Sequence, residues 1–195
     1  MAELEEFDQF ALGVARESWQ LFRRDPAMFV IAWVLMFLGS CFSFGLLAGT
    51  LHVGFIELCR RARRGEPISA SILFSRFDAL VPSLIAFLVL TIAIAIGLFL
   101  LVVPGLVIAL FAIFTLHVIA YESLSGVDAI RRSYELVRES PVHVLALLVL
   151  VALAQALGGM ILLGVLLTYP LSLIALTIGY ERLGGLAPTP ALAAF

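Results

Sequence analysis

The chain has 195 residues, of which 63% are hydrophobic and 13% are charged, and its mean hydropathy is +1.13. A soluble domain of this length usually has about a quarter of its residues charged. The composition therefore excludes an ordinary water-soluble domain and predicts an integral membrane protein. The net charge of −2 gives no indication of a nucleic-acid partner. The two cysteines, Cys41 and Cys59, form no CxxC pair and no disulfide framework.

The N-terminal segment is acidic and lacks a basic region before a short apolar core, so we expect no cleavable signal peptide. Phe7, Val14 and Leu21 help to give residues 7–24 an apolar face, which predicts an amphipathic helix in the membrane interface. The stretch 26–56 follows, and it contains no Asp, Glu, Lys or Arg. Its 31 residues are long for one span and short for two, and the glycines near its middle favour two.

Two longer uncharged stretches, 79–121 and 140–180, have 43 and 41 residues. A helical span needs about 20 apolar residues, so each stretch predicts two spans. Between these stretches, Ser125 and Asp128 form a capping-box pattern that starts a second interfacial helix. The uncharged, proline-containing segment 186–195 predicts a disordered tail.

The predicted fold is therefore all-α, a polytopic membrane protein with six transmembrane helices in three hairpins. It forms a single domain over residues 1–185, with amphipathic interfacial helices before the first and fifth spans. The predicted interfacial helices are 7–24 and 126–139, and the predicted spans are about 26–44, 47–63, 79–100, 104–121, 141–158 and 164–182.

All twelve basic residues are arginines, and they fall at 16–24, 60–76, 131–138 and 182. With six spans, these positions share one face of the membrane, and the loops on the other face are uncharged. The positive-inside rule then places the arginines and both termini in the cytoplasm. The predicted location is the bacterial inner membrane.

Two similar segments lie 115 residues apart, RESWQLFRRDP at 16–26 and RRSYELVRESP at 131–141. Each precedes a predicted hairpin on the same face of the membrane, which predicts a parallel internal repeat. Chance similarity between two amphipathic segments is the alternative.

Four segments support a resemblance to a known group, namely RGEPIS…LFSRF at 64–77, LLVVPGLVIALF at 100–111, YESLSGVDAIRRSYELVRESP at 121–141 and YERLGG at 180–185. In their order and spacing they resemble small bacterial membrane proteins of unknown function. That group is related to the membrane domain of some glycerophosphodiester phosphodiesterases and to the YciC-like proteins. The resemblance implies a six-span helical fold, but it implies neither that enzyme activity nor any catalytic residue.

Three ionisable residues are candidates for intramembrane chemistry: His52, Glu57 and His117. We expect Glu57 to pair with Arg60 and Arg61 in the last helical turn. A glutamate follows each histidine by five residues, but side chains five apart on a helix point about 140° away from each other. Each histidine is therefore expected to hydrogen-bond between helices rather than to activate a nucleophile.

The remaining candidates concern binding and transport. Gln155 is a polar residue inside a span and could belong to a transport path. Arginine side chains match phosphate in shape and charge, and so can hold anionic headgroups, although such clusters also orient most inner-membrane proteins. The candidate headgroup ligands are Arg60, Arg61, Arg63, Arg64, Arg131 and Arg132.

The sequence thus predicts a non-enzymatic membrane protein that binds lipid, including anionic lipid, or a membrane protein partner through its cytoplasmic arginines. A second copy of the chain is one such partner. The first alternative is a small transporter of apolar or amphiphilic solutes, and the second is a lipid-modifying enzyme. We predict no catalytic constellation, no metal site and no cofactor.

Overall fold

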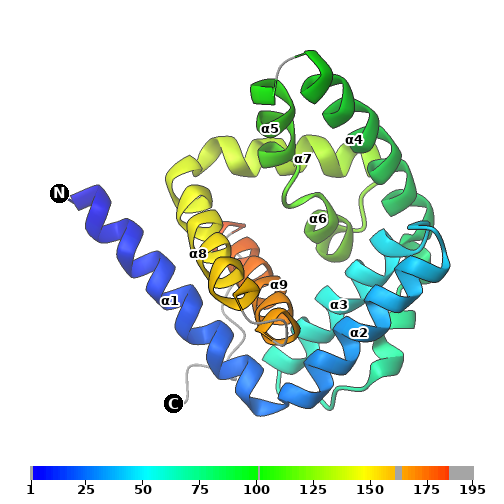
Figure 1. Ribbon diagram of the computed structural model, residues 1–195, viewed down its shortest axis with the longest axis vertical. Coiled ribbons are helices and arrows are strands. Elements are labelled where there is room, and N and C mark those ends of the chain that lie inside the picture. Colours follow the sequence, from blue (N-terminus) through cyan, green and yellow to red (C-terminus); the bar gives the residue numbers. More distant parts are fainter. Residues whose placement is uncertain (1, 101, 161–163, 185–195) are drawn as a thin grey trace. The chain divides into compact units, whose positions relative to one another are not determined.

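The computed structural model describes residues 2–100, 102–160 and 164–184, and all regular elements in these ranges are helical (Figure 1). The prediction of an all-α fold is confirmed. The predicted tail at 186–195 lies outside the described residues. The helices are α1 Ala2–Arg24, α2 Pro26–Phe42, α3 Ala48–Arg63, η1 Ala70–Phe74, η2 Phe77–Ala79, α4 Leu80–Leu100, α5 Val102–Phe111, α6 Thr115–Glu122, α7 Gly126–Glu139, α8 Pro141–Gly159 and α9 Gly164–Leu183.

The chain divides into two compact units. The first contains the chain up to Leu35, the segment Leu58–Ala70 and the chain from Ser140 onward. The second contains Met36–Glu57 and Ser71–Glu139. Helices α2 and α3 each contribute residues to both units.

Four helical segments among the described residues are long and apolar enough to cross a membrane, namely Ala70–Leu100, Val102–Glu122, Pro141–Gly159 and Gly164–Leu183. A fifth span results if α1 and α2, which meet at 94°, are counted as one broken crossing. Much of the surface of α4 and α5 consists of large apolar side chains, among them Phe87, Phe99 and Val103. Such a surface is costly in water and suits lipid, so the fold is that of a membrane protein.

The first hairpin differs from the other two. Helix α2 has 17 residues and α3 has 16, and α3 ends in arginines. At 1.5 Å per residue these helices extend about 24–26 Å, less than the roughly 30 Å of a hydrocarbon core. Neither is among the four long apolar segments, so the count of six spans stays a prediction. Gly45 lies in the turn between them with φ +83°, a conformation that favours glycine.

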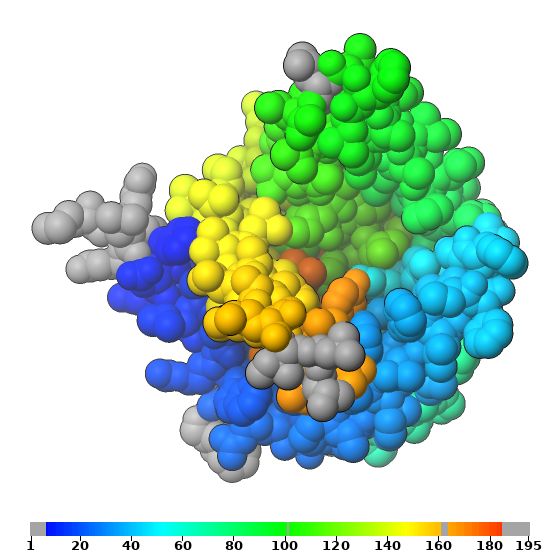
Figure 2. Space-filling view, viewed as in Figure 1, coloured from blue at the N-terminus to red at the C-terminus, as the bar shows by residue number. Residues whose placement is uncertain are grey.

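In the first unit, α1 packs along α8 and α9, as Figures 1 and 2 show for α1 and α8. Val14, Ser18 and Leu21 on this face of α1 are buried. The apolar face that predicted an interfacial helix is thus covered partly by protein. Within α9, Pro170 lies six residues after Gly164, and the helix continues past it to Leu183.

In the second unit, α7 packs against α4, α5 and α6. Its buried face contains Ala129, Ser133 and Leu136, whereas Val127 and Tyr134 are exposed. The predicted cap is confirmed, since the Ser125 hydroxyl accepts a hydrogen bond from the Asp128 amide at 3.3 Å and donates one to the Asp128 carboxylate at 2.6 Å.

Candidate functional site

Four charged residues of the first unit form an ion cluster that joins α1, α3 and α9: Glu17, Arg63, Glu181 and Arg182. Arg63 Nε lies 3.0 Å from Glu181 Oε2, and Arg63 Nη2 lies 3.6 Å from Glu17 Oε2. The carboxylate of Glu17 also accepts a hydrogen bond from Arg182 Nη2. Positive and negative groups alternate, so each carboxylate has a guanidinium beside it. We call these four residues the ion cluster.

Arg63 is in the cluster because of the face of α3 on which it lies. It follows Cys59 by one helical turn, and the Cys59 thiol is buried and hydrogen-bonded to Thr177 of α9. Arg63 is only 1% exposed, and a lipid headgroup would have to displace two carboxylates to reach it. Among the predicted headgroup ligands, Arg63 is therefore committed to contacts inside the protein.

Arg182 reaches α1 through a gap at Gly13. A Cβ at Gly13 would lie 2.7 Å from Arg182 Nη1, so a larger residue would push the guanidinium away. The guanidinium carbon lies 5.8 Å from the centre of the Phe10 ring, and the same ring packs edge-on against His143 at 4.8 Å. Such cation–π and aromatic contacts help hold α1 on the α8–α9 pair.

The other arginines of the α3 cluster lie nearer the surface. Arg60 and Arg61 are half-buried, and Arg64 is exposed and lies 3.8 Å from Glu66. The helix ends in a Schellman motif, in which the Gly65 amide donates to Ala62 O and the Glu66 amide donates to Arg61 O. Gly65 adopts the required left-handed conformation with φ +73°.

Arg131 and Arg132 belong to the second unit, on α7. Arg131 is exposed and forms the predicted pair with Glu135 at 3.5 Å. Arg132 lies 3.6 Å from Glu122 at the end of α6 and 3.7 Å from Glu135. The structure thus places the six predicted headgroup ligands in two groups, Arg60 to Arg64 in one unit and these two in the other.

Glu57 has a partner that the sequence did not suggest. Its carboxylate lies 3.8 Å from Arg76 Nη1, and the same guanidinium donates hydrogen bonds to Ala120 O at 3.0 Å and to Asp78. Arg76 therefore links α3, the end of α6 and the loop around η2. It was missed because it stands 19 residues from Glu57, beyond the reach of any helical spacing rule.

The two histidines that the sequence predicts inside the membrane are brought together. The rings of His52 on α3 and His117 on α6 lie 6.2 Å apart and meet edge to face. His117 is buried and also packs edge-on against Phe114 at 5.8 Å. The neighbours that the structure gives these rings are therefore aromatic, an arrangement suited to packing.

Gln155 joins α8 to α9. Its amide Nε2 donates to Ser172 Oγ at 3.0 Å and lies 3.5 Å from Thr168 O. A hydrogen bond of this kind between apolar helices stabilises their association in lipid. Gln155 therefore forms a hydrogen bond between two helices.

Ser133, which the sequence analysis did not single out, hydrogen-bonds to backbone groups at the break between α5 and α6. Its hydroxyl donates to Phe111 O at 2.7 Å and accepts from the Phe114 amide at 3.1 Å. Backbone groups freed at such a break need partners wherever lipid surrounds the helix. The serine of α7 supplies both, and so fixes α7 to the broken helix.

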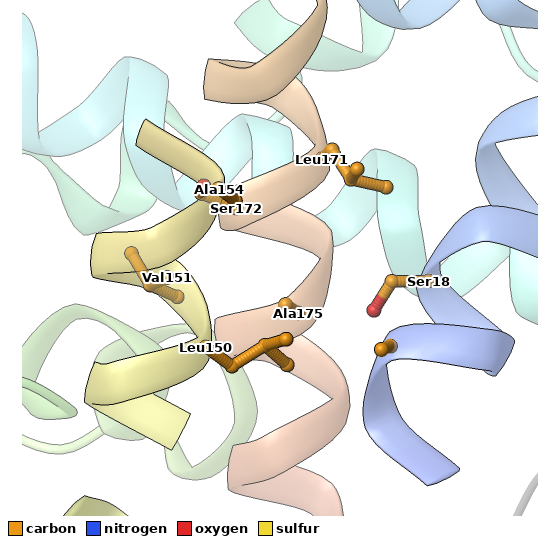
Figure 3. A pocket seen from close by; sticks show the side chains of 8 residues that line it. Ser18, Leu150, Val151, Ala154, Leu171, Ser172 and Ala175 are labelled. Atoms are coloured by element: carbon orange, nitrogen blue, oxygen red, sulfur yellow. The ribbon is translucent and has the colours of Figure 1, made fainter. Parts of the chain in front are cut away.

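A crevice between α1, α8 and α9 has a volume of about 60 Å³ (Figure 3). Ser18 faces it from α1, Leu150 and Ala154 from α8, and Ser172 and Ala175 from α9. A water molecule occupies about 30 Å³ of liquid. The crevice is therefore too small for a lipid chain, and it reflects small side chains at a helix crossing.

Comparisons with known proteins give one match. Residues 67–194 match a family described as a domain of unknown function (DUF7847), which covers about two thirds of the chain and leaves out α1 to α3. No curated protein and no solved structure matches the chain. The comparisons give no link to the phosphodiesterase membrane domain or to the YciC-like proteins that the motifs resemble.

Proposed function

Since this chain belongs to the DUF7847 family, whose function is unknown, we propose a role from its own residues. The protein is a multi-pass, non-enzymatic protein of the bacterial inner membrane that binds anionic lipid headgroups through arginines on its cytoplasmic face. A membrane protein partner, or a second copy of the chain, is the alternative occupant of that surface. The observation that carries the proposal is the surface position of arginines in the last turn of α3 and on α7, two helices that border long apolar segments in the sequence.

Four arginines are the proposed headgroup ligands: Arg60, Arg61, Arg131 and Arg132. Arg131 is exposed, and the other three are half-buried. The pairs of Arg131 and Arg132 with glutamate are worth about 1 kcal/mol or less, so a phosphate that takes two hydrogen bonds from a guanidinium can compete with them. Arg64 belongs to the same surface, whereas Arg63 serves the ion cluster.

The proposed orientation follows from charge. All arginines lie near one set of helix ends if the chain crosses six times, which puts both termini in the cytoplasm. The first hairpin, at about 24–26 Å, would need local thinning of the bilayer, which costs a fraction of a kcal/mol for each Å of mismatch. A four-span arrangement without that hairpin also keeps both termini on one side.

A parallel repeat remains part of the proposal. Pro26 and Pro141, 115 residues apart, each begin a helix directly after an amphipathic one. The helices that follow, α3 and α9, begin at Ala48 and Gly164. The order of elements in the two segments is thus the same.

Transport of an apolar or amphiphilic solute is the second candidate. Its weakness is that two polar pairs in the apolar segments serve helix contacts, Gln155 with Ser172 and Thr50 with Ser83. A lipid-modifying enzyme ranks third, because a histidine would have to lie within hydrogen-bond reach of a nucleophile that it activates. Wild-type behaviour of His52→Ala and His117→Ala would exclude it.

The test is native mass spectrometry on the full chain, released from micelles that contain phosphatidylglycerol. We expect wild type to retain the anionic lipid and a variant with Arg60, Arg61, Arg131 and Arg132 changed to Gln to lose it. The matched control changes two exposed arginines outside the proposed set, Arg23 and Arg138, to Gln. If both variants lose the same amount of anionic lipid, or if wild type retains none, the arginines serve only to orient the protein in the membrane.

A further inference from the structure

A second binding site is suggested by a cavity of about 450 Å³ in the first unit, where α1 ends, α2 begins and α3 ends. Cavities that hold small molecules usually measure about 300–1,000 Å³. All residues that line this one belong to the same unit. It is far larger than the crevice between α1, α8 and α9.

The lining of the cavity is amphipathic. Its apolar part includes Leu21, Phe29 and Ala62, all of which are buried. Its charged part consists of Arg24, Asp25 and Glu66, and of these Arg24 and Glu66 are exposed. A ligand that fills it must combine apolar groups with charged ones, as a phospholipid does at the base of its headgroup.

The charges favour a zwitterion over an anion. One guanidinium and two carboxylates line the cavity, and Arg64 outside the lining lies 3.8 Å from Glu66 and offsets one of these carboxylates. The lining therefore has no excess of positive charge for a headgroup that carries only a phosphate. An added ammonium can lie between Asp25 and Glu66, while the phosphate pairs with Arg24. Asp25 is held in place by its own helix, because its Oδ1 accepts a hydrogen bond from the Met28 amide at 3.0 Å.

The cavity also lies at the depth of the membrane interface, where lipid headgroups reside. The uncharged stretch 26–56 begins at Pro26, the first residue of α2, and α3 ends among arginines. The boundary between charged and uncharged sequence marks the membrane interface, where headgroups reside. A phospholipid in the adjoining leaflet could therefore enter without crossing the hydrocarbon core.

We propose that this cavity binds a phospholipid whose headgroup carries an ammonium, such as phosphatidylethanolamine. The proposal rests on the lipid-binding function above and adds a second headgroup class at a separate site. In this proposal the arginines of α3 and α7 bind anionic lipid, and the cavity binds the zwitterionic phospholipid.

The experiment is native mass spectrometry on the full-length protein from micelles that hold equal amounts of phosphatidylethanolamine and phosphatidylglycerol. Wild type retains both lipids. Glu66→Gln and Arg24→Gln each lower the retained phosphatidylethanolamine about tenfold, the effect expected from one charge-assisted hydrogen bond, and leave phosphatidylglycerol unchanged. Both positions are exposed, so neither change threatens folding.

Arg23→Gln is the matched control, because it removes an exposed arginine next to Arg24 that neither lines the cavity nor belongs to the proposed headgroup ligands. It retains both lipids. Wild-type retention of phosphatidylethanolamine by both cavity variants overturns the proposal, as does an equal loss with Arg23→Gln or exclusive retention of the anionic lipid by wild type. The variant with Arg60, Arg61, Arg131 and Arg132 changed to Gln separates the two proposals. If this variant still retains phosphatidylglycerol, the proposed function is refuted and the cavity result stands.

Discussion

Replacing Arg63 with glutamine removes the guanidinium that lies between Glu17 and Glu181 in the ion cluster. Arg63 is 1% exposed and Glu181 is 5% exposed, so Glu181 would stay buried after losing the guanidinium that lies 3.0 Å away. Breaking a buried pair in this way costs about 3–5 kcal/mol. Glu17 retains Arg182, and so the loss should come mainly from Glu181.

The assay is equilibrium unfolding of the purified protein in mixed micelles, followed by tryptophan fluorescence. Both tryptophans, Trp19 and Trp33, lie in the unit that contains the ion cluster, so the signal reports on that unit. We expect Arg63→Gln to lower the free energy of unfolding by about 3–5 kcal/mol. The control Arg64→Gln removes an ion pair of the same unit whose side chains are nearly half exposed, and should cost less than about 1 kcal/mol.

A second variant tests the cause of the loss. Adding Glu181→Gln to Arg63→Gln also removes the buried carboxylate that lost the Arg63 guanidinium. The double variant should therefore recover at least half of the lost stability. A loss below about 1 kcal/mol for Arg63→Gln would refute the reasoning, because it would mean that the cluster is solvated. Absence of recovery in the double variant would show that the loss comes from packing and not from charge.

Three further predictions use the same unfolding experiment, followed by far-ultraviolet circular dichroism so that the helices of both units contribute to the signal. Gly65→Ala should cost about 1–2 kcal/mol, since alanine is strained at φ +73°, and an unchanged stability would contradict the Schellman geometry. Gln155→Leu should cost about 0.6–2 kcal/mol through the lost bonds between α8 and α9, and a neutral result would deny them a role. Gly54→Ala should disrupt the second unit, because its Cβ would collide with the Leu73 backbone, whereas Gly159→Ala meets nothing within 4 Å; equal stability of the two variants would refute the close approach.

Local signals in the sequence predicted several elements well. Ser125 and Asp128 marked the start of α7, and the hydrogen bonds between them show why a hydroxyl and a carboxylate three residues apart suit that position. Gly65 is a local signal of the same kind, since glycine adopts without strain the left-handed φ that ends α3. These signals work because their partners are only a few residues apart.

Contacts between distant segments could not be predicted. Arg63 and Arg64 are neighbours in one arginine cluster, yet one is buried between carboxylates and the other is exposed. The signal that could have separated them is the position of Arg63 one turn after Cys59, on the buried face of α3. The partnership of Glu57 with Arg76, and the hydroxyl of Ser133 at the break between α5 and α6, depend on tertiary packing.

Hydropathy also has a limit in the first hairpin. It showed 31 uncharged residues between Pro26 and Ile56, but not that Ser43 to Leu47 form the turn. That turn leaves α2 and α3 with 17 and 16 residues, of which the last residues of α3 are charged. The number of residues that a helix has for crossing the membrane depends on where the adjoining turn begins. Composition does not reveal that position.

The most direct test of the account is the side of the membrane on which its arginine-bearing segments lie. In a Cys41→Ser background, with buried Cys59 kept, single cysteines at Val103 and Glu139 can be labelled in intact cells with a membrane-impermeant maleimide. The account predicts that Val103→Cys reacts from outside and that Glu139→Cys reacts only after the cells are opened. Labelling of both from the same side would contradict it, because Val103 and the arginine-bearing helix α7 would then lie on the same side of the membrane.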